Sequence, residues 1–128
     1  MNENLKQLFE AAKAASENAY SPYSNFEVGA AVLTKNNKIF TGCNIENASF
    51  GVTVCAERTA IFKAVSDGER EFEAIAIYVN SDQLFPPCGV CRQVMSEFSS
   101  DMIVIYGNDK KIVESDIMKL LPESFSLA

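Results

Sequence analysis

The 128-residue sequence contains no histidine, and its 11 Lys and Arg residues are outnumbered by 17 Asp and Glu residues. Without histidine, a site for a soft metal ion would depend on cysteine thiolates. The net charge of −6 and the pI of about 4.6 would repel a phosphate backbone, and the sequence has no basic patch with interleaved aromatic residues. We therefore expect no nucleic-acid partner.

Long hydrophobic runs are also missing, since no stretch approaches the roughly 20 apolar residues that a membrane-spanning helix needs. The start of the chain, MNENLKQLFEAAKAA, is amphipathic and lacks the basic and apolar regions of a signal peptide. We expect no membrane partner and a cytoplasmic location. Four cysteines in a reducing compartment indicate metal or thiol chemistry and argue against a disulfide framework.

Hydrophobic periodicity predicts the order of helices and strands. Apolar residues at helical spacing predict a helix over residues 3–19, which SPYS ends. EVGAAVLT (27–34) and KIFTGC (38–43) predict two antiparallel strands around Asn36 and Asn37, which tolerate the positive φ of a tight turn. The rest of the chain predicts a helix at 55–65, a buried strand at 74–79, a helix at 87–98, a buried strand at 102–106, an edge strand at 111–113 and a short helix at 115–121 capped by Ser115.

These elements predict one α/β domain spanning residues 1–128, because the length allows a single core of ordinary size. The expected architecture is a three-layer α/β/α arrangement with a mixed five-stranded sheet whose last strand is antiparallel. Ligands of such sheets gather at the carboxyl ends of strands, where helices begin. Both cysteine-containing segments, VCAERTA (54–60) and PPCGVCRQ (86–93), fall there.

Three cysteines in these segments indicate a metal site. Cys88 and Cys91 are three residues apart, so they face the same way on a first helical turn, but an isolated C-x-x-C could equally be a pair of buried small residues. Adding Cys55 gives three thiolates at two helix N-termini, where the helix dipoles favour the charged form. This donor set points to zinc, and three protein ligands leave a fourth position for water, as in catalytic sites.

Two charged residues beside Cys55 suggest catalysis. Glu57 could take a proton from the water and pass it to a leaving group, although a lone Glu in a first helical turn can also simply complement the dipole. Three thiolates and Zn²⁺ leave a net charge of about −1, which weakens the metal as a Lewis acid. Arg58 could offset this charge by donating to cysteine sulfurs. Arg92 has the equivalent position after Cys91, and either arginine could instead be a surface residue.

Cys43 is the remaining cysteine, and its sequence context allows two interpretations. As a fourth ligand it would close the site and leave a structural zinc module without catalysis. As a small apolar residue at a strand end it would take no part in metal binding.

The combination C-A-E and P-C-G-x-C resembles the zinc-dependent cytidine deaminases of the small homotetrameric type, a class with a Cys₃ zinc site and a non-ligand glutamate. Other segments also resemble this family, namely SPYSNFEVGAAVLT, GCNIENASFG, CAERTAIFKAVSDG, PCGVCRQV and PESFSL. The resemblance therefore covers most of the chain and favours a non-ligand role for Cys43. It implies one Zn²⁺ per subunit, held by Cys55, Cys88 and Cys91, with Glu57 as the catalytic residue.

The resemblance also implies substrate contacts at Phe26, Asn44, Glu46, Phe50, Ala56, Pro87 and Phe125. Phe26 would pack near the nucleoside, while Asn44 and Glu46 would bind the ribose 3′-hydroxyl. Backbone groups of Ala56 and Pro87 would address the carbonyl of the base and the leaving amine. Phe50 stands where relatives often have tyrosine, and Pro86 where serine usually precedes P-C. Phe125 would stack on the pyrimidine in a neighbouring subunit, so a homotetramer would share its sites between subunits.

The activity implied is hydrolytic deamination of free cytidine and 2′-deoxycytidine to uridine and 2′-deoxyuridine, with release of ammonia, in pyrimidine salvage. Two alternatives stay open on the sequence. A deaminase of the same fold could act on another aminopyrimidine nucleoside such as blasticidin S, or the chain could be the structural zinc module described above. Deamination of a polynucleotide would require a strand-binding surface, and the acidic balance of the chain argues against one.

Overall fold

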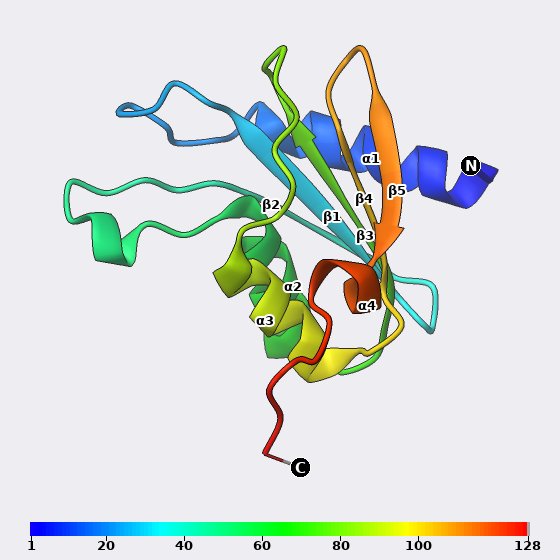
Figure 1. Ribbon diagram of the computed structural model, residues 1–128. Helices are drawn as coiled ribbons and strands as arrows, with labels where there is room; N and C mark the ends of the chain where they lie inside the picture. The colour runs from blue at the N-terminus through cyan, green and yellow to red at the C-terminus, as the bar shows by residue number, and fades with distance from the viewer. Residues whose placement is uncertain (128) are drawn as a thin grey trace.

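The structure is a computed structural model, and it describes residues 1–127. The strands are β1 (Val28–Thr34), β2 (Ile39–Cys43), β3 (Phe72–Val79), β4 (Ile103–Gly107) and β5 (Ile112–Asp116). The helices are α1 (Glu3–Ser16), the 3₁₀ turn η1 (Phe50–Val52), α2 (Ala56–Ser66), α3 (Gly89–Phe98) and α4 (Ile117–Leu120) (Figure 1). Among the described residues, no helix has the length and apolar character to cross a membrane.

The five strands form one mixed sheet in the order β2-β1-β3-β4-β5. Only β3 and β4 pair in parallel, and β5 is an antiparallel edge strand, which confirms the predicted arrangement. The β1–β2 hairpin turns where the sequence predicts, and Asn37 adopts the positive φ of 70° that the tight turn requires.

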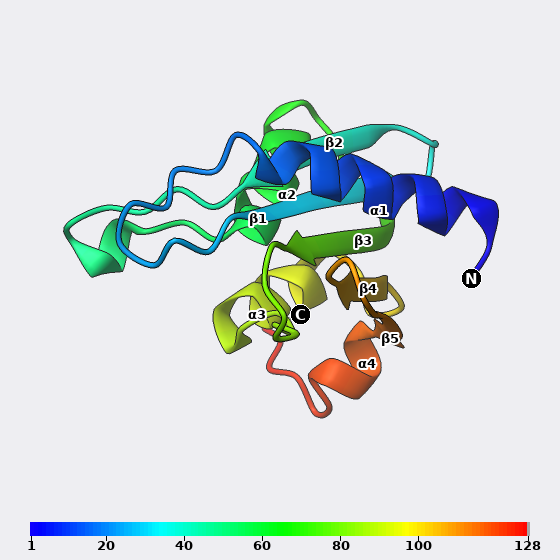
Figure 2. The ribbon, with the colours of Figure 1, turned by 90° about the horizontal axis from the view of Figure 1, so that it is seen from above.

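Helices cover both faces of the sheet because the central strands alternate their side chains between two cores. On one face, Ala31 and Ala74 belong to a cluster with residues of α1. On the other, Val32 and Ile75 pack with residues of α2, α3 and α4. Figure 1 shows α2 and α3 together on one side of the sheet, and Figure 2 shows α1 running along β1. The predicted three-layer architecture is confirmed.

Helix α2 lies directly on β2 because Gly42 has no side chain. A Cβ atom at Gly42 would lie 2.5 Å from the Ala60 nitrogen and 2.9 Å from the Ala56 oxygen, closer than real Cβ atoms approach. This contact sets the height of α2 above the sheet. It therefore also sets the position of Cys55, which immediately precedes the helix.

The predicted boundaries of the first and the last helix differ from the structure. The first helix ends at Ser16, before residue 19, because Asn18 and Ala19 donate to carbonyls only three residues earlier and so tighten the last turn. Ser115 does not cap the last helix, because it pairs with Val104 inside β5. Asp116 is the N-cap instead, and its carboxylate accepts from the Lys119 nitrogen at 2.9 Å.

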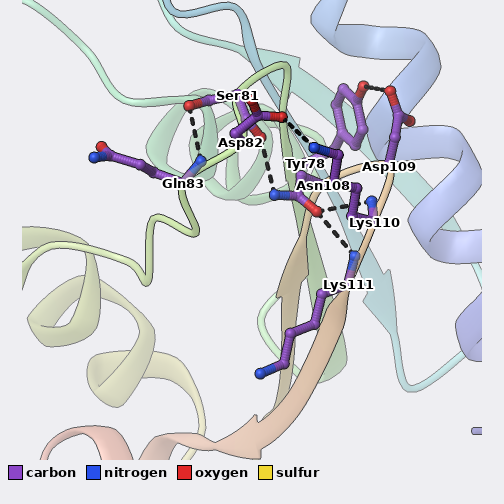
Figure 3. A network of polar contacts seen from close by, with 8 residues as sticks. All are labelled: Tyr78, Ser81, Asp82, Gln83, Asn108, Asp109, Lys110 and Lys111. Carbon is purple, nitrogen blue, oxygen red and sulfur yellow. Dashed lines mark hydrogen bonds and ion pairs between the residues drawn. The ribbon is translucent and has the colours of Figure 1, made fainter.

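The loop from β3 to α3, residues 80–88, is tied to the β4–β5 turn at its start (Figure 3). The buried Asn108 side chain donates from Nδ2 to the Ser81 oxygen at 2.9 Å. Next to it, Lys110 and Asp82 form an ion pair at 2.9 Å. These contacts fix where the loop leaves the sheet on its way to Cys88.

Candidate functional site

The three predicted cysteine ligands meet at the N-termini of α2 and α3. Cys55 is the N-cap of α2, Cys88 is the N-cap of α3, and Cys91 lies in the first turn of α3. An N-cap side chain turns back over the first helical turn, so it meets the residue three positions later. The Sγ atoms of Cys88 and Cys91 are 3.6 Å apart.

The sulfur atoms of Cys55, Cys88 and Cys91 all lie within 4.8 Å of one another. Tetrahedral zinc with Zn–S bonds of about 2.3 Å requires sulfurs roughly 3.8 Å apart, so this donor set fits one zinc ion. Of the described cysteines, Cys43 alone lies outside the cluster. The closed four-cysteine alternative therefore lacks its fourth ligand.

The electrostatics of the cluster favour one negative charge, on the Cys55 sulfur. The pKa of the Cys55 thiol falls to about 5, chiefly because Cys91 donates a hydrogen bond to it and also because Arg58 lies beside it. The pKa of Cys91 is raised, first because its proton is shared with Cys55 and then because the group is buried. A metal cation would take the place of this shared proton.

Arg58 lies where the sequence predicts a donor to the cysteine sulfurs. Its Nη2 atom is 3.5 Å from the Cys55 Sγ atom and 3.4 Å from the Thr53 oxygen. The hydrogen bond to Cys55 is the main reason that the pKa of Arg58 is raised. Its Nε atom is buried without a hydrogen-bond partner among residues 1–127.

Arg92 does not share this role, and the expectation that it could donate to sulfur is wrong. Its Nε atom donates to the Pro87 oxygen at 2.7 Å, and its Nη1 atom donates to the Leu120 oxygen at 2.8 Å. The side chain is half-buried between the start of α3 and the end of α4.

Glu57 is a buried carboxylate at the second position of α2, with only 5% of its surface exposed. Burial is the largest cause that raises its pKa to about 7, and the negative charge of Cys55 adds to the effect. A group whose pKa lies near neutral pH can both accept and donate a proton, which is the property that a general acid–base residue needs.

A pocket of about 270 Å³ opens beside Glu57 and the cysteines. Its walls come from β1 and β3, the loop that follows β2, the start of α2 and the loop before α3. The lining residues are Val28, Asn44, Glu46, Phe50, Thr53, Val54, Cys55, Ala56, Glu57, Ile77, Phe85, Pro86 and Cys88. Most of the predicted substrate positions therefore line one cavity with the catalytic candidates.

Asn44 and Glu46 are oriented by contacts with the segment that precedes β1. The Asn44 side chain accepts from the Val28 nitrogen at 3.0 Å and donates to the Phe26 oxygen at 2.8 Å. Glu46 accepts from the backbone nitrogens of Tyr23 and Ser24 at 2.9 and 3.1 Å, and from the Ser24 hydroxyl. The hydroxyl is also the largest cause that lowers the pKa of Glu46, so this side chain remains a carboxylate.

Three predicted substrate residues lie outside the lining of the pocket. Phe26 is one aromatic ring away, because it packs edge-on against Phe85 with centroids 4.9 Å apart. Pro87 precedes Cys88 and turns its carbonyl toward Arg92. Phe125 is 70% exposed and borders a separate hollow together with residues of α3. Phe125 therefore does not line the pocket of its own chain. Its expected contact with the pocket of a neighbouring subunit stays a prediction.

Several pocket residues escaped the sequence analysis. Thr53 and Phe85 directly precede the two cysteine segments and Val54 is the first residue of one of them, so their proximity to the cysteines is the signal that indicates them. Val28 and Ile77 come from buried strands, and no sequence signal separates them from other core residues. Ser24 lies in the family segment SPYSNFEVGAAVLT, but no sequence pattern indicates that its hydroxyl donates to Glu46.

The fold and the site together define an α/β protein with a three-cysteine zinc centre and a carboxylate beside it at the edge of a pocket. The sequence model described as the cytidine and deoxycytidylate deaminase zinc-binding region matches residues 2–107. The chain belongs to this family.

Relatives match along nearly the whole chain. A cytidine deaminase of Sporosarcina psychrophila is 47% identical over 125 residues, which cover 96% of this chain and 92% of the relative. A cytidine deaminase of Halalkalibacterium halodurans is 49% identical over 123 residues, covering 94% and 93%. The crystal structure of cytidine deaminase from Burkholderia pseudomallei superposes with a TM-score of 0.90 at 47% identity, covering 98% of this chain and all of the other.

Proposed function

We propose that this protein is a zinc-dependent hydrolase that converts free cytidine and 2′-deoxycytidine to uridine and 2′-deoxyuridine, and that residues 1–128 act as one catalytic domain. The observation that carries the proposal is the buried Glu57 carboxylate at a pocket whose wall also holds cysteines of the metal cluster. The relatives and the solved structure described above are cytidine deaminases, which favours cytidine over blasticidin S as the substrate.

The reaction adds water at C4 of the base and releases ammonia, so the new carbonyl oxygen at C4 comes from water, while one hydrogen of the water stays on the ring nitrogen and the other leaves with the amine. Zinc, when bound by Cys55, Cys88 and Cys91, supplies Lewis-acid activation of water. Glu57 accepts one proton from the water and delivers it to the ring nitrogen, then takes the second proton from the hydroxyl added at C4 and delivers it to the departing amine. Arg58 donates to the Cys55 sulfur and so draws negative charge away from the ligand set.

Asn44 and Glu46 are proposed to bind the ribose 3′-hydroxyl. A carboxylate offers about four acceptor positions, and three donors already occupy Glu46, which leaves room for one hydroxyl donor. Backbone groups of Ala56 and Pro87 are proposed to contact the carbonyl and the amine of the base, with the Pro87 oxygen using the lone pair that Arg92 leaves free. Phe50 lies in the lining of the pocket, and it would cover the base from the side of the loop.

The proposal extends to the assembly and its setting. Phe26 is proposed to pack near the nucleoside, and a homotetramer would bring Phe125 against the nucleoside of a neighbouring site, which fits the exposure of Phe125 and its absence from the lining of the pocket of its own chain. The enzyme would act in the cytoplasm on free nucleosides, in pyrimidine salvage, with no nucleic-acid or membrane partner.

The decisive experiment incubates the zinc-loaded protein with cytidine and measures uridine and ammonia. Glu57→Gln should keep one zinc per chain but lose activity by about 10²–10⁴-fold, because the amide cannot carry the proton. A zinc-loaded wild-type protein that forms no uridine would contradict the proposal. A Glu57→Gln variant with ordinary activity would contradict the role assigned to Glu57.

Substrate choice is tested by comparing turnover of cytidine, 2′-deoxycytidine and blasticidin S by the same preparation. We expect the two free nucleosides to react and blasticidin S to react far more slowly. A preference for blasticidin S would move the assignment to the rival deaminase while leaving the zinc chemistry intact.

A further inference from the structure

Arg92 connects two parts of the chain that are distant in sequence. One guanidinium donates to the Pro87 oxygen at 2.7 Å and to the Leu120 oxygen at 2.8 Å. Pro87 immediately precedes the metal ligand Cys88, and Leu120 is the last residue of α4. The two bonds therefore join the peptide that leads into the metal site to the segment that leads into the C-terminus.

Arginine suits this bridge because its planar fork directs several N–H groups at fixed angles, so one side chain can satisfy two carbonyls. Pro87 is buried, and a buried carbonyl without a donor carries a desolvation penalty. The Leu120 carbonyl is one of the unpaired acceptors at the end of a helix, where positive charge is favoured. Both hydrogen bonds therefore stabilise the fold more than a hydrogen bond from a solvent-exposed arginine would.

The next residue of α3 reinforces the connection. The Gln93 side chain donates from Nε2 to the Phe125 oxygen at 3.3 Å. Two adjacent residues that follow the ligand Cys91 therefore hold the C-terminal segment at two places. The start of α3 therefore carries the two ligands Cys88 and Cys91, and the next two residues of the helix contact the C-terminal segment.

We infer that Arg92 is a positioning residue that fixes the Pro87–Cys88 peptide against α3 and so keeps the Cys88 sulfur within reach of the Cys91 and Cys55 sulfurs. The same side chain couples the C-terminal segment to the metal loop. An effect of this coupling on the rate of deamination rests on the proposed function. Its effect on how tightly the protein holds zinc depends only on the cysteine cluster.

The test measures zinc transfer from the loaded protein to an excess of a chromogenic chelator, at a temperature well below unfolding. Arg92→Ala should release zinc about tenfold faster than wild type, since removing a group that orients a metal ligand weakens binding by roughly 10–100-fold. The matched control is Arg70→Ala. Arg70 also donates to two carbonyls, those of Val65 and Glu69 at 2.8 and 2.9 Å, but at the opposite end of α2 from Cys55.

A second readout separates positioning from general stability. Cobalt-substituted Arg92→Ala should show altered thiolate-to-metal and d–d absorption bands, whereas Arg70→Ala should keep the wild-type spectrum. The inference is overturned if zinc release by Arg92→Ala stays within about threefold of the Arg70→Ala rate, or if its cobalt spectrum is unchanged.

If Arg92→Ala does not fold, Arg92→Lys is compared with Arg70→Lys by the same two measurements and the same limits. Lysine keeps the charge, but its single nitrogen lacks the fork that reaches both carbonyls. Because zinc release and the cobalt spectrum are measured without nucleoside, they can support the role of Arg92 even if the wild-type protein forms no uridine. Conversely, an active enzyme whose Arg92 variants hold zinc normally would overturn this inference only.

Discussion

At the scale of single residues, the site depends on one repeated geometric relation at two helix starts. Cys55 and Arg58, like Cys88 and Cys91, are an N-cap residue and the residue three positions later. Sequence spacing alone predicts this relation, because it follows from the geometry of a first helical turn. Spacing does not predict the partner of Arg92, because the two carbonyls that it contacts belong to a loop and to a helix end.

The Ser24 hydroxyl provides a residue-scale prediction. Ser24→Ala removes one of the three donors that hold Glu46, so KM for cytidine should rise about threefold to tenfold while kcat changes less than about twofold. The matched control is Ser21→Ala in the same loop, because the Ser21 side chain has no hydrogen bond within the described part of the chain. Steady-state kinetics of both variants check the prediction, and equal KM values in the two variants would contradict it.

At the scale of helices and strands, the sequence predicts elements well where apolar residues repeat and poorly where polar ones form the structure. Both buried strands and all the main helices were predicted from periodicity. The final strand is longer than predicted, because Glu114 to Asp116 extend it through backbone pairing with β4 and carry no apolar signal. Likewise, Val28 and Ile77 face the pocket only because of how β1 and β3 are placed under α2, which no local pattern encodes.

The contact between α2 and β2 gives an element-scale prediction. Gly42→Ala should lower the free energy of unfolding by about 1–3 kcal/mol, because a methyl group would have to displace the backbone of α2. Gly51→Ala is the control, since a Cβ atom there meets nothing within 4 Å. Thermal and denaturant unfolding measure the difference. If the two variants prove equally stable, α2 does not depend on this close approach.

At the scale of the whole molecule, the chain exposes large aromatic side chains at its surface. Phe50 is 88% exposed at the mouth of the pocket, and Phe125 is 70% exposed near the C-terminus. Exposed apolar groups of this size are typical of contact surfaces between proteins. Their positions support the proposed homotetramer, in which the C-terminal segment of one subunit would complete the pocket of another.

Mixed assemblies test whether sites are shared between subunits. Phe125→Ala and Glu57→Gln should each have low activity alone, but subunits of the two variants that are refolded together should regain activity. In such a mixture about a quarter of the sites would combine an intact Glu57 from one chain with an intact Phe125 from its neighbour, if each site draws on two subunits of a symmetric assembly. Uridine formation by the mixture should therefore exceed the average of the two separate variants, and the molar mass in solution should be that of a tetramer. Activity equal to that average would mean that Phe125 does not serve a neighbouring site.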